Sequence, residues 1–465
     1  MPPRSSVDPD RLLPADATTR DIARDLYQRV ASAPIVSPHG HVSAELLRAN
    51  APFDDVASLL VSRDHYVTRL LHAQGVDLSA LGVGASADPR DIWRLLAKHW
   101  TAFAGTASAY WLRDELATVF GITEDLSSET ADALYDTIAM KLTEPTFRPR
   151  ALFDRFGIEV LATTDDPLDD LAAHAALRND PTFGGRVLPT FRPDNYIDPD
   201  AAAFGGAIER LLAATEQPGT FGGYLAALEH RREHFIANGA VSLDIGVVDP
   251  TTVDLARGDA DELFQQVVAG TADAAARQAF RGHMLVQMAR MSVDDGLVMT
   301  LHAGVHRNHS TATFEAVGPD TGHDIPVPTS FTRALRPLLE RFGLQKGFHL
   351  VLFTVDETAY SRELAPLAGF YPSVFIGAPW WFLDAPDAML RWRSAVTETA
   401  GFYRTSGFID DTRAFLSIAA RHDTARRVDA AFLGRLVREG RLPLASAEVI
   451  ADDLVSAIPR AVFKL

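Results

Sequence analysis

The chain alternates short apolar runs with longer amphipathic segments, and this alternation limits the folds that it can adopt. The runs are four to nine residues long and rich in β-branched side chains, which is typical of buried strands. They cover residues 34–37, 158–164, 186–191, 240–248, 297–304, 348–355, 372–378 and 405–410. Between them, apolar residues recur at helical spacing, for example in residues 167–178, 199–213, 273–294, 329–342, 384–401 and 412–437.

Eight strands that alternate with helices predict an α/β fold of the (β/α)8 TIM-type barrel class. Such a barrel carries its active site at the C-terminal ends of its strands. An open doubly wound sheet is the alternative arrangement of the same elements. Polar residues at the ends of the runs therefore become the candidates for function.

One interval breaks the alternation, because residues 43–150 carry helical patterns and few strand-like runs. The interval is far longer than an ordinary connection between a strand and a helix. We interpret it as a helical insertion between strands 1 and 2, lying over the active-site end of the barrel. The sequence thus predicts an N-terminal segment with barrel strand 1 (1–42), the helical insertion (43–150) and the remainder of the barrel (151–465).

The sequence "PHGH" places His39 and His41 two residues apart, directly after the first apolar run. In an extended backbone, residues i and i+2 point to the same side, so both imidazoles can converge on one ion. The histidine content of the chain would produce roughly half an H-x-H pair by chance. The pair is therefore evidence for a metal site only if polar residues at other strand ends lie close to it.

Polar side chains follow most of the other runs, and the predicted barrel directs them toward a common pocket. They are Asp165 and Asp166 after the second run, Arg192 and Asp194 after the third, Asp244 and Asp249 with the fourth, His302 and Arg307 with the fifth, and Asp410, Asp411 and Arg413 with the eighth.

The first and eighth strands are neighbours in a closed barrel, so His39 and His41 meet a carboxylate from the eighth run. Two imidazoles and a carboxylate fit a single divalent metal with an open position, and Zn²⁺ is the usual choice for such ligands. Spacing leaves open which role Asp410 and Asp411 each take, and Asp411 has the alternative role of a helix N-cap. His302 is either a third imidazole of this site or a satisfied barrel histidine.

The positions of the lysines and arginines limit the reactions and the substrates that the predicted site can accommodate. The chain has four lysines, and none lies at the end of a predicted strand, which excludes a two-metal site bridged by a carboxylated lysine and disfavours a Schiff base. Arg192, Arg307 and Arg413 follow strand ends, where guanidinium groups suit bidentate capture of a carboxylate, although each alone more often forms a structural ion pair. The "PWWF" segment with Trp381 caps such a substrate or packs in the core.

The composition of the chain limits the classes of partner that it is expected to bind. The formal charge of -17 disfavours nucleic acid and anionic membranes, and the absence of cysteine excludes disulfides and thiolate chemistry. There is no apolar run long enough to span a membrane, and the first 25 residues lack the apolar core of a signal peptide. We therefore expect a cytoplasmic protein without nucleic-acid or membrane partners, and a homo-oligomer stays open.

Taken in order, these residues resemble the uronate isomerase (glucuronate isomerase) family of the amidohydrolase superfamily. The similar motifs extend over almost the whole chain and are "PHGHV", "DHYVTRLLHAQGV", "TTDDPLDDL", "TFRPDN", "LHAGVHRN", "GPDTGHD", "PWWF" and "DDTRAFLSIAARH". The resemblance implies the isomerisation of D-glucuronate to D-fructuronate and of D-galacturonate to D-tagaturonate. It implies a hexuronate as the small-molecule substrate.

The resemblance also implies roles for particular residues. The family's metal ligands match His39, His41 and Asp411, and its substrate-contacting arginine matches Arg413. Other pocket residues of the family match His65, Tyr66, Arg192 and His302. The motifs depart from the family at Gly40, Val42 and "RNHS", which leaves the pocket shape and the preferred uronate open.

The implied reaction moves a proton between C1 and C2 through an enediol, so it needs a base, an acid and an electrophile. We assign Asp411 as a ligand and proton shuttle, and Tyr66 or His65 as the partner that handles an oxygen proton. The substrate contacts are assigned to Arg192, Arg307, Arg413, His302 and Trp381. There are two alternatives: a metal-dependent hydrolase of the same superfamily and a catalytically silent sugar-acid binder. The mass of the product separates the first from an isomerase, because hydrolysis adds water and isomerisation does not.

Overall fold

The computed structural model describes residues 8–465 and has a mixed α/β architecture built chiefly on parallel sheets. Residues 1–7 of the predicted N-terminal segment, and with them the start of the stretch searched for a signal peptide, lie outside the described residues. None of the described helices combines the length and the apolar character needed to span a membrane.

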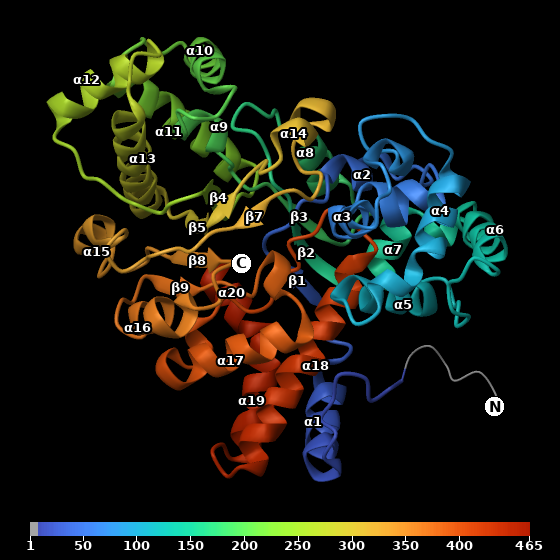
Figure 1. Ribbon diagram of the computed structural model, residues 1–465. Coiled ribbons are helices and arrows are strands. Elements are labelled where there is room, and N and C mark those ends of the chain that lie inside the picture. The colour runs from blue at the N-terminus through green and yellow to red at the C-terminus, as the bar shows by residue number, and fades with distance from the viewer. Residues whose placement is uncertain (1–7) are drawn as a thin grey trace.

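Two parallel sheets lie at the centre of the molecule with helices around them (Figure 1). The first sheet has the strand order β1-β2-β3, the second has the order β4-β5-β8-β9, and a small antiparallel hairpin, β6-β7, follows β5. The strands are β1 (Ile35–Ser37), β2 (Ile158–Ala162), β3 (Arg186–Leu188), β4 (Ser242–Val247), β5 (Val298–Ala303), β6 (Val305–His306), β7 (Ile325–Pro326), β8 (Leu350–Thr354) and β9 (Val374–Ile376).

Backbone contacts continue beyond the edges of both sheets. Phe191, which follows β3, bridges to Leu243 of β4, and Ile376 of β9 bridges to Thr405. The His41 N–H donates to the carbonyl oxygen of Thr412 at 3.0 Å. The segment after β1 and the segment after residue 405 therefore lie side by side, although they are far apart in the sequence.

The prediction of an eighth strand at residues 405–410 is wrong, because this segment contributes only the single bridge at Thr405. Gly407 has a φ of 75°, which interrupts the extended backbone. The Ser406 hydroxyl replaces part of the missing ladder by accepting from the Ala378 N–H at 3.0 Å and donating to the Gly407 carbonyl at 2.7 Å. The other seven predicted strands are present with shorter ends, and the sequence analysis missed the β6-β7 hairpin.

The predicted helices are present, but several begin later than their sequence pattern indicates. Before α8, for example, the carboxylates of Asp166 and Asp169 accept from the Leu168 and Leu171 N–H groups, which holds this stretch in turns. The helices outside residues 43–157 are α1 (Ala17–Val30), α8 (Ala172–Asn179), α9 (Asp194–Ile197), α10 (Phe204–Ala214), α11 (Phe221–Ala237), α12 (Arg257–Val268), α13 (Ala274–Asp295), α14 (Thr311–Val317), α15 (Arg336–Phe342), α16 (Ala365–Ala368), α17 (Pro386–Ala400), α18 (Ser417–Arg438), α19 (Leu444–Val455) and α20 (Ala457–Phe463).

Residues 43–157 form helices that gather on one side of the sheets, coloured blue to green in Figure 1. Their apolar faces share one hydrophobic cluster with β1 and β2, in which Leu47, Trp93 and Phe120 join Ile35 and Leu161. The helices are α2 (Ala44–Ala49), α3 (His65–Ala73), α4 (Pro89–Lys98), α5 (Ala107–Thr118), α6 (Ala131–Leu142) and α7 (Pro149–Arg155).

Gly377, directly after β9, allows close packing beneath the polar end of β5. A Cβ atom at this position would lie 2.3 Å from the ring of Phe353, and that ring stacks on His302 with centroids 4.1 Å apart. We expect Gly377→Ala to lower the free energy of unfolding by about 1–3 kcal/mol, because overpacking forces this ring to move. Urea unfolding measures the change.

Gly222 in α11 is the matched control, since a Cβ atom there meets nothing within 4 Å. Gly222→Ala should leave stability unchanged or raise it, because alanine favours the helix. Wild-type stability in Gly377→Ala would contradict the tight packing beneath β5.

Candidate active site

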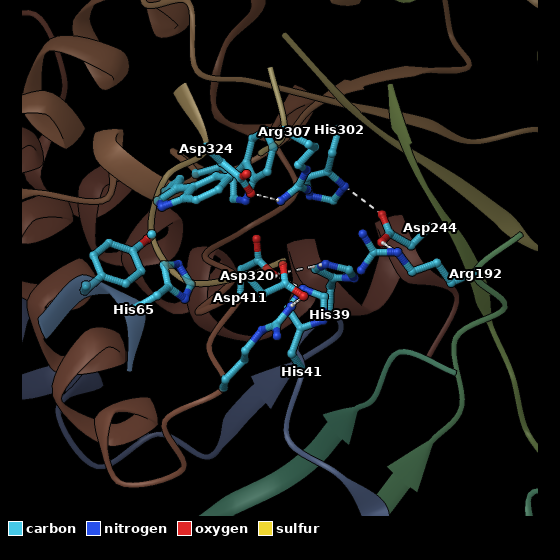
Figure 2. A pocket seen from close by; sticks show the side chains of 15 residues that line it. His39, His41, His65, Arg192, Asp244, His302, Arg307, Asp320, Asp324 and Asp411 are labelled. Carbon is cyan, nitrogen blue, oxygen red and sulfur yellow. Dashed lines mark hydrogen bonds and ion pairs between the residues drawn. The ribbon is translucent and has the colours of Figure 1, made fainter. Parts of the chain in front are cut away.

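One pocket gathers all the residues to which the sequence analysis gave a role in the site (Figure 2). They come from β5 itself, from the segments after β1, β3 and β5, from the start of α3, and from the loops before and after α17. The predicted residues in the pocket lining are His39, His41, His65, Tyr66, Arg192, His302, Arg307, Trp381, Asp411 and Arg413. Asp244, Asp320, Gly322, Asp324 and Trp380 also line it, whereas Asp165, Asp166, Asp194, Asp249 and Asp410 do not.

The two histidines after β1 converge on one carboxylate oxygen. The Nε2 atoms of His39 and His41 lie 3.2 and 3.0 Å from Oδ1 of Asp411. Ligand atoms of His39, His302 and Asp411 all lie within 4.8 Å of one another, which makes them a candidate metal centre. His302, which the sequence analysis gave a substrate contact while leaving a third imidazole open, thus belongs to the same cluster.

The residues of this centre fit a metal ion. Nε2 of His302 is buried without a hydrogen-bond partner. Buried polar atoms that lack a partner are rare in folded proteins, and a role in binding an ion is one of the standard explanations. Imidazole nitrogens and a carboxylate oxygen are also the donor set that divalent transition metals prefer.

The position of His302 is fixed on its other side. Its Nδ1 lies 2.6 Å from Oδ1 of Asp244 on the neighbouring strand β4, as Figure 2 shows. Its ring stacks on those of His39 and Phe353, with centroid separations of 4.9 and 4.1 Å. A carboxylate on the second nitrogen is the arrangement that orients a ligating histidine.

The two consecutive aspartates of the eighth run have separate environments. Asp410 accepts from Ser37 Oγ at 2.5 Å and lies 3.0 Å from Nε2 of His422, so it is held away from the pocket. Asp411 has a φ of 44° and faces the histidines. The alternative that Asp411 is an N-cap is wrong, because α18 begins at Ser417.

Charge in the pocket is set by burial and by these neighbours. Burial disfavours ionisation of Asp411, but His39 and His41 outweigh it and hold the pKa of Asp411 well below its usual range. Burial and, next, the charge of Arg413 lower the pKa of His65 to about 3. The Asp411 carboxyl is therefore an anion and His65 a neutral imidazole at physiological pH.

The first turn of α3 brings an imidazole and a phenol to the pocket wall. The Asp64 side chain caps this helix by accepting from the Tyr66 N–H at 2.9 Å. The rings of His65 and Tyr66 lie 5.0 Å apart, and His65 meets the edge of Trp381 at 5.5 Å. Both residues therefore face the pocket from the helical region rather than from a strand.

Three arginines surround the pocket, and each pairs with a carboxylate. Arg307 lies 2.9 Å from Asp324, which Figure 2 marks, and Arg413 lies 3.1 Å from Asp320. Arg192 lies 3.0 Å from Asp194 and 3.7 Å from Asp244. The pocket thus combines a metal-ligand cluster, proton-carrying groups and several cationic groups that can bind an anion.

A family model of glucuronate isomerase matches residues 15–460 of the chain. The chain belongs to the glucuronate isomerase family. A uronate isomerase of Corynebacterium efficiens is 52% identical over 461 residues, which is 98% of each chain. Among solved structures, a glucuronate isomerase of Caulobacter crescentus has a TM-score of 0.97 at 47% identity, covering 98% of this chain and 97% of that one. A uronate isomerase of Thermotoga maritima has a TM-score of 0.93 at 28% identity, covering 98% and 99%.

Membership of the glucuronate isomerase family confirms the resemblance that the motifs indicated. The partners Asp320 and Asp324 were not among the predicted site residues, because they lie far along the segment that follows β5. The "GPDTGHD" motif, which carries both, is the signal in the sequence that points to them.

Proposed function

We propose that this protein, as a uronate isomerase, interconverts D-glucuronate with D-fructuronate and D-galacturonate with D-tagaturonate in the pocket of Figure 2. The full-length match to the glucuronate isomerase family carries the proposal. The pocket supports it independently, because it combines an anionic carboxylate, a phenol, a neutral imidazole and arginines. Such groups suit proton transfer on an anionic sugar.

We propose that the strands belong to a closed (β/α)8 barrel with a helical insertion over its mouth, in which the irregular segment that begins at residue 405 takes the place of the eighth strand. The bridges at Phe191 and Thr405 and the bond from His41 to Thr412 support closure. The proposed regions are the N-terminal segment with strand 1 (1–42), the insertion (43–150) and the remaining barrel (151–465). The delivery of His65 and Tyr66 to the pocket from α3 supports a functional role for the insertion.

We propose that His39, His41 and Asp411, with His302 beside them, hold a single divalent metal, and that Zn²⁺ is this metal. The clustered donor atoms of His39, His302 and Asp411, the contact of His41 with Asp411 and the unpartnered Nε2 of His302 support this assignment. When bound, such an ion supplies positive charge that stabilises the developing oxyanion of the substrate.

The protein's own groups would perform the binding and the proton transfers. Arg413, with Arg192 and Arg307, binds the substrate carboxylate, since guanidinium groups pair bidentately with carboxylates. Asp411, an anion in the pocket, serves as a proton shuttle between carbon atoms of the enediol. Tyr66, with His65 beside it, handles a hydroxyl proton, and Trp381 provides an apolar face for the sugar.

The metal assignment predicts a change in metal content. We expect the purified protein to hold one divalent ion per chain, and His39→Ala to weaken metal affinity by at least about tenfold, because a ligand is lost. Mass spectrometry of the metal after dialysis against a graded chelator measures both. His306→Ala, which removes an exposed histidine outside the pocket, is the control. Equal retention of metal in both variants would overturn the assignment.

The reaction itself is tested by the mass of the product. An isomerase converts D-glucuronate to a ketose of identical mass, whereas a hydrolase of the same superfamily adds water to a scissile bond. We expect turnover of D-glucuronate and D-galacturonate without a change of mass. Turnover of glucuronolactone alone, with gain of water, would favour the hydrolase.

A further inference from the structure

The hydroxyl of Tyr66 is bound to a carboxylate outside the pocket lining. Tyr66 Oη donates to Oδ2 of Asp384 at 3.0 Å, and Nη1 of Arg421 donates to the same oxygen at 2.6 Å. Asp384 follows the short turn Trp381–Leu383, and Arg421 belongs to α18. Both side chains are almost completely buried, at 6% and 1% exposure, and neither lines the pocket.

Arg421 is held in one place by its surroundings. Its guanidinium lies 3.8 Å from the ring centroid of Trp111 and 4.7 Å from that of Tyr66. Its Nε donates to Ser417 Oγ at 3.1 Å. A buried arginine is costly unless its charge is paired, so the bond to Asp384 also holds Arg421 in place. Fixing Arg421 in turn fixes the oxygen of Asp384 that faces Tyr66.

The direction of the hydrogen bond determines what Tyr66 can do. A phenol has one proton, and Tyr66 gives it to Asp384. The lone pairs of its oxygen are then left to accept a proton from a ligand in the pocket that Tyr66 lines. Tyr66 can therefore take up a proton only as it passes its own proton on.

We propose that Asp384, positioned by Arg421, is the buried proton acceptor through which Tyr66 works; this inference rests on the proposed isomerase function. A substrate O–H bond breaks and a new O–H bond forms on Tyr66. The original phenol O–H bond breaks, and its proton passes to Oδ2 of Asp384. The negative charge moves from Asp384 to the substrate oxygen. Both transfers reverse when the substrate oxygen regains its proton, so no co-reactant is consumed.

The electrostatics of Asp384 suit an exchange of protons near neutral pH. Burial raises its pKa to about 6, against the opposing effects of Arg421 and Tyr66. The charged or titratable groups that face it are Tyr66 and Arg69 of α3, Arg421 of α18 and Asp411 of the preceding loop. Asp384 accepts a proton only when ionised, so kcat should fall as the pH drops below about 6.

A double-mutant cycle on kcat for D-glucuronate tests the inference, with Asp384→Asn, Tyr66→Phe and the combined variant. We expect Asp384→Asn to lower kcat by about thirtyfold, with KM within about threefold, because asparagine keeps the shape but takes no proton. Tyr66→Phe should lose at least as much. The combined variant should be no slower than Tyr66→Phe alone, since both act in one relay. The fall of kcat below pH 6 should be absent in Asp384→Asn.

The matched control is Asp429→Asn. Asp429 is another carboxylate paired with a buried arginine, Arg393, at 2.6 Å, and it does not line the pocket. The Asp429→Asn variant should be less stable than the wild type, but its folded fraction should keep the wild-type kcat. Arg421→Lys keeps the charge but not the fixed geometry, so its kcat should lie between those of the wild type and Asp384→Asn. This variant also serves where Asp384→Asn does not fold.

Multiplicative losses in the combined variant, or wild-type kcat and pH profile in Asp384→Asn, would overturn the inference. Wild-type kcat in Arg421→Lys would equally contradict the positioning by Arg421. These results differ from failure of the proposed function, in which the wild-type protein itself does not convert either uronate.

Discussion

Replacing Asp411 with asparagine is expected to lower kcat for D-glucuronate by about 1,000-fold or more while the fold survives. Both His39 and His41 contact the carboxylate of Asp411, and these imidazoles keep it ionised. Asparagine has nearly the same shape but can neither carry the charge nor shuttle a proton. The variant thus loses a proton-transfer group, worth about 10²–10⁴-fold, together with a metal ligand.

Steady-state kinetics and circular dichroism check this expectation together. Asp387→Asn, which changes an exposed carboxylate in the first turn of α17, is the control and should behave as the wild type. Full activity in Asp411→Asn would remove Asp411 from the mechanism. Loss of the folded signal would leave the assignment to Asp411→Glu, which keeps the charge and should restore part of kcat.

Replacing Arg413 with methionine is expected to lower kcat/KM for D-glucuronate by about 100-fold, or ~3 kcal/mol, mainly through KM. Arg413 pairs with one carboxylate in the described structure, Asp320, and is 37% exposed. Arg192, in contrast, is already engaged by Asp194 and Asp244. Arg307 is as exposed as Arg413, but its partner Asp324 is buried and would be left unpaired, whereas Asp320 is 41% exposed. Arg413 is thus the arginine that can best exchange its partner for the carboxylate of an incoming substrate.

The reference variant for this prediction is Arg441→Met. Arg441 is an exposed arginine that pairs with Glu398 and Glu439 far from the pocket. It should keep wild-type kinetics, because exposed ion pairs contribute little. An unchanged KM in Arg413→Met would assign the carboxylate to another arginine, with Arg192→Met as the next variant.

The strands that the sequence predicted correctly, such as residues 242–247 and 298–303, are continuous extended runs that pair with a neighbour along their whole length. The segment 405–410 failed because the conformation of Gly407 depends on packing against Pro459 and Leu454, which lie far along the chain. The β6-β7 hairpin has two residues per strand, too few to produce a periodic signal.

Some of the pocket residues could be predicted from the sequence and others could not. Polar residues that follow predicted strands, such as His39, Arg192 and His302, could be proposed from position alone. His65 and Tyr66 lie at the start of a helix, where no strand pattern marks them, so only the resemblance to a family pointed to them. Asp384 and Arg421 were not predicted, because their pairing joins α18 to a turn far away in the sequence, and such contacts leave no local sequence pattern.

Proton NMR of D-glucuronate with the purified protein tests metal-dependent isomerisation most directly, with spectra taken before chelation, after chelation and after restoration of Zn²⁺. The His39→Ala variant follows the same protocol. We expect D-fructuronate to appear, chelation to suppress it, Zn²⁺ to restore it and His39→Ala not to produce it. Absence of conversion of both D-glucuronate and D-galacturonate by the untreated protein would contradict the proposed function.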